Sequence, residues 1–216
     1  MTTVRIFFEK RGEAAYISLL DLQRVFQRLL KISALPVWYT QGFNPHIYLS
    51  FSCPLSLGQE SVCESCEVKT EAETIDAEQW RSALQRLMPR GILITKVAPA
   101  VQKVGEIASA EYELKLPAAS LAAVEQYNTA PSVAITKKTK RGQKTLELKD
   151  YLPQMEMQQQ GDWLTGCVVL PCGSGEALNL NPALLLQALE TMGGAPAWQC
   201  SVLRTHLYTK NNTDFC

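Results

Sequence analysis

Residues 38–46 (WYTQGFNPH) bring together the side chains in this chain best suited to chemistry or recognition. Gln41, Asn44 and His46 offer hydrogen-bond donors and acceptors, and Phe43 offers an aromatic face. The glycine permits unusual backbone angles, and the Asn-Pro step favours a turn. The mixture predicts a binding loop or an acid–base site. The structural alternative is that Phe43 fills the core while Asn44 and His46 cap loop carbonyls.

Metal chemistry is a second candidate, because Cys63 and Cys66 form a C-x-x-C pair with Cys53 upstream. Zinc needs four converging ligands, and His46 is the single nearby imidazole. The pair lies in a run that reads as a strand, where residues three apart point to opposite faces. We therefore expect small buried thiols and no metal.

A basic run at 136–144 (TKKTKRGQK) suggests contact with phosphate groups around a hairpin tip. Ferredoxin-like sheets also bind RNA by stacking bases on exposed aromatics, although the RNA-binding strand consensus is absent here. The alternative is a solvated basic turn. The residues expected to form an anion- or RNA-facing patch are Lys137, Lys138, Lys140, Arg141 and Arg204.

The composition excludes several classes of protein. Lys+Arg and Asp+Glu balance at 21 each, so the molecule as a whole has no strong field for nucleic acid or membrane. No apolar run approaches the roughly 20 residues of a membrane span, and no export signal is visible. Seven scattered cysteines without such a signal predict reduced thiols and a cytoplasmic location. Walker, Rossmann and nucleophile-elbow patterns are absent.

The elements that must position these residues fall into two similar series. In the first half, strands are predicted at 4–10, 37–40, 61–70 and 92–99, with an extended run at 47–55. Helices are predicted after Ser18 and after Asp76, each a good N-cap. This order of strand, helix, strand, strand, helix, strand is the split βαβ, or ferredoxin-like, unit.

The second half repeats the theme. Strands are predicted at 110–116, 132–138 and 162–170, with a final strand near 201–209, and residues 145–152 are expected to form a hairpin partner across the basic turn. Helices are predicted at 118–127 and after Asn181-Pro182. The sequence thus predicts an α+β protein of tandem ferredoxin-like (βαββαβ) domains, with helices on one face of antiparallel sheets. The expected boundaries are 1–100 and 110–210, joined by a linker at 101–109.

The run from Ser18 to Ser61, above all its QGFNPH core, resembles the N-terminal signature of the radical-SAM-linked, or radical-SAM-associated, protein family. Members typically show S-H-L-D-L before a helix, then Q-G-F-N-P-H-P and P-L-P-x-G-x-x-S. Residues 135–152 and 201–208 resemble two further blocks. Such proteins are described by a domain of unknown function and occur alone or fused to a cobalamin-binding radical SAM protein. The resemblance implies a radical SAM protein as partner.

This chain departs from the family pattern at two positions. Leu19 stands where histidine is usual, and Ile47 replaces the second proline. The loss of one motif histidine argues against a two-histidine catalytic or metal site. The iron–sulfur signature C-x-x-x-C-x-x-C is absent, so the chain is not itself expected to be the radical SAM enzyme.

We therefore expect a non-catalytic adaptor or substrate-binding protein associated with a radical SAM enzyme, with a role in RNA metabolism as an extension. The expected binding site, where the first helix meets the loop, comprises Asp21, Arg24, Gln41, Gly42, Phe43, Asn44 and His46. No cofactor and no membrane association are expected. Two alternatives stay open: an RNA-processing or RNA-modifying enzyme with His46 as general acid or base, and a purely structural interaction module.

Overall fold

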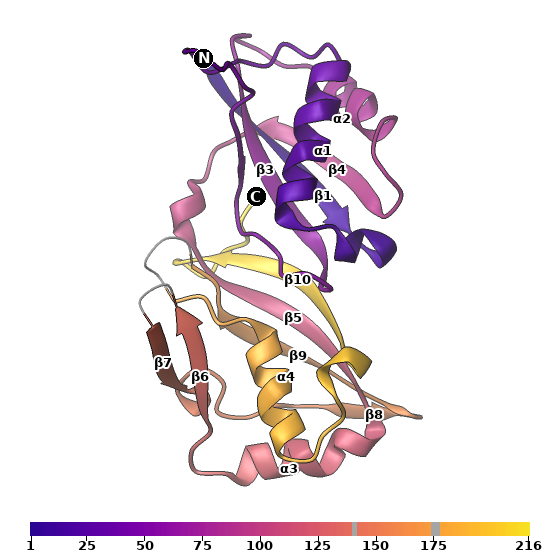
Figure 1. Ribbon diagram of the computed structural model, residues 1–216, viewed down its shortest axis with the longest axis vertical. Helices are drawn as coiled ribbons and strands as arrows, with labels where there is room; N and C mark the ends of the chain where they lie inside the picture. The colour runs from indigo at the N-terminus through magenta and orange to yellow at the C-terminus, as the bar shows by residue number, and fades with distance from the viewer. Residues whose placement is uncertain (140–141, 174–177) are drawn as a thin grey trace. The chain divides into compact units, whose positions relative to one another are not determined.

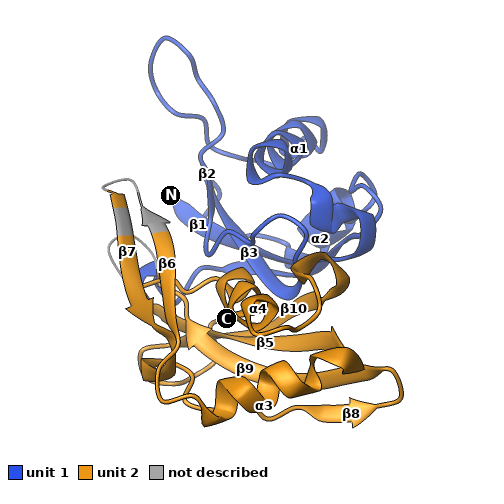
Figure 2. Ribbon diagram, turned by 60° about the horizontal axis from the view of Figure 1, so that its bottom comes forward, with its two compact units in different colours: residues 1–106, 216 blue, residues 107–215 orange. Residues whose placement is uncertain are grey.

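The computed structural model describes residues 1–139, 142–173 and 178–216 of an α+β protein (Figure 1). Over these residues the chain forms four α-helices and ten strands. It divides into two compact units, unit 1 with residues 1–106 and Cys216, and unit 2 with residues 107–215 (Figure 2). No helix of the described ranges is long and apolar enough to cross a bilayer.

Unit 1 is an antiparallel sheet with strands in the order β4-β1-β3-β2. Its helices α1 and α2 lie on one face of that sheet (Figure 1). The elements are β1 (Thr2–Lys10), α1 (Leu19–Ile32), β2 (Leu49–Phe51), β3 (Glu60–Thr70), α2 (Ala77–Gln85) and β4 (Ile92–Pro99).

The helix starts predicted in unit 1 are confirmed by their caps. The Ser18 hydroxyl accepts a hydrogen bond from the Asp21 backbone N–H at 3.2 Å, and Asp76 Oδ1 accepts one from Gln79 at 3.0 Å. Below the helices, buried side chains of β1 and β3 meet Phe26, Leu30, Trp80 and others in one core. Burial of these apolar faces fixes which side of the sheet the helices cover.

Within unit 2 the strands pair antiparallel in the order β10-β5-β9-β8. The hairpin β6–β7 forms a separate two-stranded sheet. The elements are β5 (Ile107–Pro117), α3 (Leu121–Thr129), β6 (Ala134–Thr139), β7 (Gly142–Glu147), β8 (Gln158–Gln160), β9 (Trp163–Pro171), α4 (Pro182–Thr191) and β10 (Ser201–Thr209).

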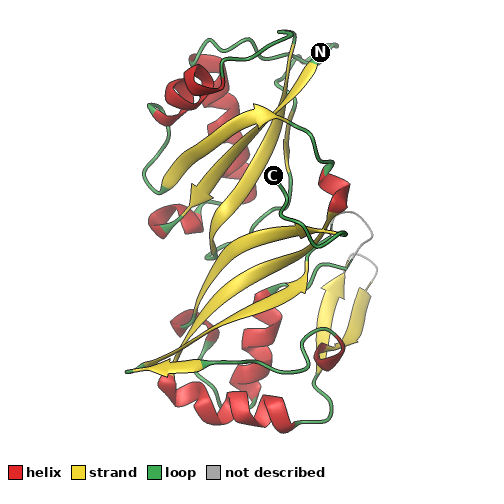
Figure 3. Ribbon diagram, turned by 180° about the vertical axis from the view of Figure 1, so that it is seen from behind, coloured by secondary structure: helices red, strands yellow, loops and turns green. Residues whose placement is uncertain are grey.

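The predicted hairpin is confirmed, although its second strand is β7 (Gly142–Glu147) rather than residues 145–152, and the predicted Asn181-Pro182 helix start is confirmed. Asn181 Oδ1 accepts from the Ala183 backbone N–H at 3.0 Å, and the proline occupies the first turn of α4. Helices α3 and α4 cover one face of the unit 2 sheet. Seen from behind, each sheet presents a face that its own helices leave uncovered (Figure 3).

Two sequence predictions are wrong at the level of elements. Residues 37–40 do not form a strand; they make isolated bridges, Val37 to Thr70 and Tyr39 to Ile47. The chain reverses direction within a few residues of this segment, so a regular strand pairing cannot extend along it. The first strand after α1 is therefore β2. Residues 107–109 belong to β5 rather than to the predicted 101–109 linker, because Ile107 is buried and pairs with β10.

Candidate functional site

The 38–48 loop is closed by a pair of reciprocal contacts between Thr40 and His46. The Thr40 backbone N–H donates to the His46 carbonyl at 2.9 Å, and the His46 N–H donates to the Thr40 hydroxyl at 3.1 Å. Gly42, at φ +134°, turns the chain between them in a region that favours glycine. The five residues between the two contacts are therefore presented as one tight turn.

The His46 ring is oriented from within the turn. Its Nδ1 lies 3.1 Å from the Asn44 carbonyl oxygen and 3.0 Å from the Thr40 hydroxyl. A carbonyl can only accept, so we assign the proton to Nδ1, which makes Nε2 the acceptor in the neutral ring. His46 is an exposed residue, so its ring is accessible from solvent.

Phe43 stands at the surface of the turn. Its exposed fraction is 108% of the reference value, so none of the described residues covers the side chain. The alternative that Phe43 fills the core is therefore wrong. The related expectation, that loop carbonyls are capped, is confirmed for His46 and the Asn44 carbonyl. The exposed ring on this tight turn is available for contact with a partner.

The base of the loop is anchored on β3 and in the unit 1 core. Ile47, the departure from the family pattern, is 4% exposed and belongs to that core. The Trp38 backbone N–H donates to the Lys69 carbonyl at 2.8 Å. The Lys69 ammonium lies 4.6 Å from the Tyr48 ring centroid and 5.5 Å from that of Trp38. These cation–π contacts brace both ends of the loop.

The predicted partners on α1 are engaged with each other. Asp21 Oδ1 accepts from Arg24 Nη1 at 2.9 Å, and Asp21 Oδ2 accepts from the Ser18 hydroxyl at 2.7 Å. These bonds lower the pKa of Asp21, with the Ser18 contact the largest cause. Figure 2 shows the segment between α1 and β2 extending away from α1 as a long loop. The observed side-chain contacts of Asp21 and Arg24 are thus within α1 and its cap, and Gln41 in the loop is exposed.

The predicted anion patch is assembled only in part. Lys137 donates its Nζ to the Asn179 carbonyl, which uses one of its donors within unit 2. Lys140 and Arg141 lie outside the described residues, as does the side chain of Lys138. Arg204 is 1% exposed, because it shares a face of β10 with the buried Val202. The prediction that Arg204 belongs to an exposed patch is wrong.

A polar cluster on the unit 2 sheet was missed by the sequence analysis. Glu111 Oε1 accepts from the Thr205 hydroxyl at 2.8 Å and from His206 Nδ1 at 3.1 Å, while Oε2 accepts from the Tyr208 hydroxyl at 3.3 Å. The His206 and Tyr208 rings stack at 5.8 Å. Glu111 alternates with buried Ala110 and so lies on the face without helices. The signal available was the alternation of polar residues along both strands.

The electrostatics of this cluster follow from those contacts. Hydrogen bonds, first from Thr205 and then from His206 and Tyr208, lower the pKa of Glu111. Burial, followed by the nearby Glu111 charge, raises the pKa of Tyr208. The Glu111 carboxylate accepts hydrogen bonds from three side chains. We therefore interpret it as a fixed anion that orients the His206 ring.

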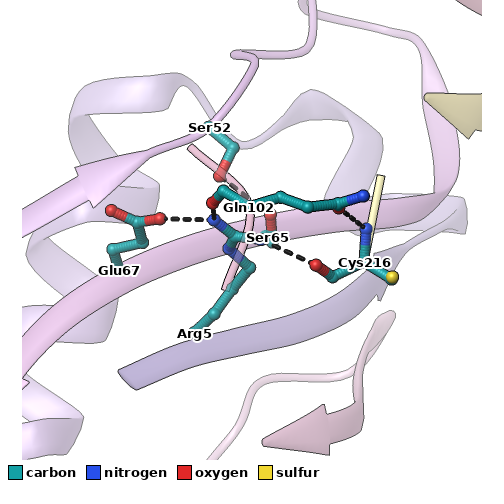
Figure 4. Close-up of polar contacts among 6 residues, drawn as sticks. All are labelled: Arg5, Ser52, Ser65, Glu67, Gln102 and Cys216. Carbon is teal, nitrogen blue, oxygen red and sulfur yellow. Dashed lines mark hydrogen bonds and ion pairs between the residues drawn. The ribbon is translucent and has the colours of Figure 1, made fainter. Parts of the chain in front are cut away.

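A second polar cluster closes unit 1 around Arg5, which is 1% exposed (Figure 4). Its guanidinium donates to Glu67 Oε1 at 2.7 Å, to the Cys216 carbonyl at 2.9 Å and to the Gln102 carbonyl. Gln102 Oε1 in turn accepts the Cys216 backbone N–H at 2.6 Å. A buried guanidinium with these oxygen partners is structural, since it ties two distant chain segments to β1.

Among the described residues, the C-x-x-C pair and the motif position of Leu19 do not form a metal or ligand site. Cys66 is completely buried, which raises the pKa of its thiol well above the ordinary value, whereas Cys63 contacts the Ser61 hydroxyl. Among the described residues, no three His, Cys, Asp or Glu side chains are grouped to hold a metal ion. Leu19 borders a recess with Lys10 of about 10 Å³, room for no more than a single water.

The fold and site define an α+β protein that presents an aromatic turn from its first unit. Residues 3–182 match the family described as "Uncharacterized protein conserved in bacteria (DUF2344)", and the chain belongs to that family. No curated protein matches the chain. A solved structure, titled "Crystal Structure of an Unknown Protein from Galdieria sulphuraria", is 12% identical, covering 93% of this chain and 95% of that one. Its TM-score of 0.26 is too low to indicate a shared fold.

Proposed function

We propose that this chain is a non-catalytic adaptor or substrate-binding protein that acts with a radical SAM enzyme and docks through the 38–48 loop. The observation that carries the proposal is the uncovered Phe43 side chain on a turn closed by Thr40 and His46. Water must leave the Phe43 ring when a partner covers it, which gives a favourable contribution to binding.

The closure of the turn supports docking with little ordering cost. The Thr40–His46 contacts and the buried Ile47 fix the loop before a partner arrives. A pre-formed loop loses less conformational entropy on binding than a mobile one. Burial of one rigid aromatic anchor at the centre of an interface commonly contributes about 2–3 kcal/mol.

The identity of the partner is supported by the motif rather than by the geometry. The QGFNPH loop is the part of the chain that most resembles the radical-SAM-linked proteins, and it is also the part that presents Phe43. We propose that both proteins act in the cytoplasm. RNA is proposed as a further ligand on the strength of the basic run at 136–144 alone.

We also propose that each unit is a ferredoxin-like domain. Both sheets have their strands in the order fourth, first, third, second, with one helix after the first strand and one after the third. That order is the one expected of a split βαβ unit. In unit 2 the β6–β7 hairpin is an addition to the pattern.

The proposed function is tested by co-purification from cells that express the tagged chain at native level. Wild type is expected to recover a radical SAM protein, identified by mass spectrometry, and Phe43→Ala is expected to lose it. Trp198→Ala is the matched control, because Trp198 is also exposed, at 81%, but lies outside the loop. Equal recovery with all three proteins would refute docking at Phe43, and recovery of no radical SAM protein would refute the partner.

The rival function with an observation behind it is acid–base chemistry at His46. The Asn44 carbonyl holds the proton on Nδ1, so that Nε2 is the acceptor of an exposed residue, as a general base requires. His46→Gln tests this rival with RNA as substrate. Cleavage or modification by wild type that is lost in the variant supports the rival, whereas no turnover by wild type leaves recognition as the better description.

A further inference from the structure

The hairpin β6–β7 leaves one edge of β6 without a strand partner among the described residues. The Val133 carbonyl accepts the Leu148 N–H at 2.9 Å, and the pairing then continues in antiparallel register. Alternate residues of an antiparallel strand direct their backbone groups to the same neighbour, so Val133 and Ile135 face β7. Ala134 and Thr136 must therefore direct their N–H and C=O groups to the opposite edge.

That edge borders a groove against α4, which we call the β6 groove. Its volume is about 390 Å³, and its lining is residues 132–136 with Gln187, Ala188, Thr191 and Met192. Figures 1 and 2 both show β6 between β7 and α4. No lining side chain carries a charge, which disfavours phosphate or nucleic acid as the occupant. The size is that of a small-ligand or short-peptide site.

We propose that the β6 groove binds an extended peptide segment of a protein partner, which adds to β6 as a third strand. The outward donors and acceptors of Ala134 and Thr136 match those of another extended backbone. The buried Val133, Ile135 and Ala188 would meet apolar side chains at alternate positions of the peptide. The remaining peptide side chains would face solvent and should be polar.

At residues 134–136 the edge lacks the features by which free strand edges are usually protected, whereas Lys137 and Lys138 follow in the same strand. Charged side chains, prolines and bulges commonly blunt such edges, and residues 134–136 contribute an alanine, an isoleucine and a threonine. The register from Ala134 to Thr139 is also regular, without a bulge. Lys137 could guard the strand, but its Nζ is bonded to the Asn179 carbonyl. The regular and uncharged stretch 134–136, which lines the groove, is suited to strand addition.

The proposal is tested with a fluorescent probe peptide, acetyl-Lys-Thr-Val-Thr-Val-Thr-Lys-amide, and the full chain. The probe is methylated in turn at each backbone nitrogen and its affinity is measured by anisotropy. Strand addition predicts a period of two: methylation of amides that face β6 weakens binding by about tenfold or more, and methylation of the others by less than about twofold. Uniform losses, or no binding of the unmodified probe at about 1 mM, would overturn the proposal.

The protein-side test removes the outward donor of Thr136. Thr136→Pro deletes that N–H, whereas Thr136→Val keeps it and changes the side chain by a similar amount. The expected result is about a tenfold loss of probe affinity in the proline variant and little change in the valine variant. Equal affinity in both overturns strand addition. Sedimentation that shows a dimer the probe cannot dissociate would overturn a peptide partner in favour of a second copy.

Discussion

Both units are enlarged at the same point, the connection between the first helix and the second strand. In unit 1 this connection is residues 33–48 and ends in β2, and in unit 2 it is residues 130–157, contains β6–β7 and ends in β8. The two connections present different chemistry. The first offers a side chain, Phe43, whereas the second offers the backbone groups of Ala134 and Thr136.

The shared position has a physical reason. Within their units β2 and β8 stand at the end of the strand order, and each is three residues long. A long insertion before such a strand disturbs few backbone hydrogen bonds, so the sheet tolerates it. The difference in chemistry separates two kinds of recognition, since an aromatic anchor depends on one residue and a strand edge does not depend on side-chain identity.

The largest effect is expected at the aromatic anchor. Phe43→Ala should weaken binding of the proposed radical SAM partner by about a hundredfold, because burial of the ring on binding should supply roughly 2–3 kcal/mol. Binding of the probe peptide to the β6 groove should not change. Isothermal titration with each ligand measures both quantities on one protein sample. If Phe43→Ala weakened binding of both ligands equally, the two connections would not be separate recognition sites.

A smaller effect is expected from the closure of the turn. Thr40→Val removes the hydroxyl that accepts the His46 N–H and should reduce partner affinity by about fivefold to tenfold, since the loop must then be ordered on binding. Thr40→Ser keeps the hydroxyl and is the control. If the serine variant binds as weakly as the valine variant, the hydrogen bond does not hold the loop.

Helix caps provide a comparison of stability between the units. Asp76→Ala in unit 1 and Asn181→Ala in unit 2 each remove an observed side-chain cap. Each should lower the free energy of unfolding by about 1 kcal/mol, measured by urea denaturation. Asp76→Asn and Asn181→Asp, which retain a capping oxygen, should cost less. If those conservative variants lost as much free energy of unfolding as the alanine variants, the capping role would be contradicted.

The smallest expected effect is the pH dependence contributed by Glu111. Its pKa is lowered in the folded state, so the stability it contributes is present above its unfolded value near pH 4.3 and is lost as the pH falls through the folded value. Glu111→Gln should therefore be less stable than wild type at pH 8, by about 0.5 kcal/mol at most. The two unfolding curves should converge at pH values below the folded pKa of Glu111. A gap that persists there would contradict the carboxylate's role.

The features predictable from sequence were those that repeat locally. Ser18, Asp76 and Asn181 each indicated where a helix begins. In each case the cap residue and the apolar face of the helix lie within a few residues of one another. Residues 37–40 were predicted as a strand because aromatic and branched residues favour strands. In the fold their neighbours allow only isolated bridges.

The candidate sites were harder to predict for a related reason. Whether Phe43 is buried depends on how the turn closes, and its neighbours follow no period that would reveal this. Glu111 and His206 meet through strand register across 95 residues, with a bulge next to the histidine. The free edge of β6 depends on the absence of a neighbouring strand among the described residues, which no local pattern encodes.

The most direct test of recognition by the 38–48 loop is site-specific photocrosslinking in living cells. A photoreactive benzophenone analogue of phenylalanine replaces Phe43 in one experiment and Trp198, which is also exposed, in another. The proposal predicts a crosslink from position 43 to a radical SAM protein and none from position 198. A position 43 probe that crosslinks no such protein, or crosslinks it no more than position 198 does, would contradict the central claim.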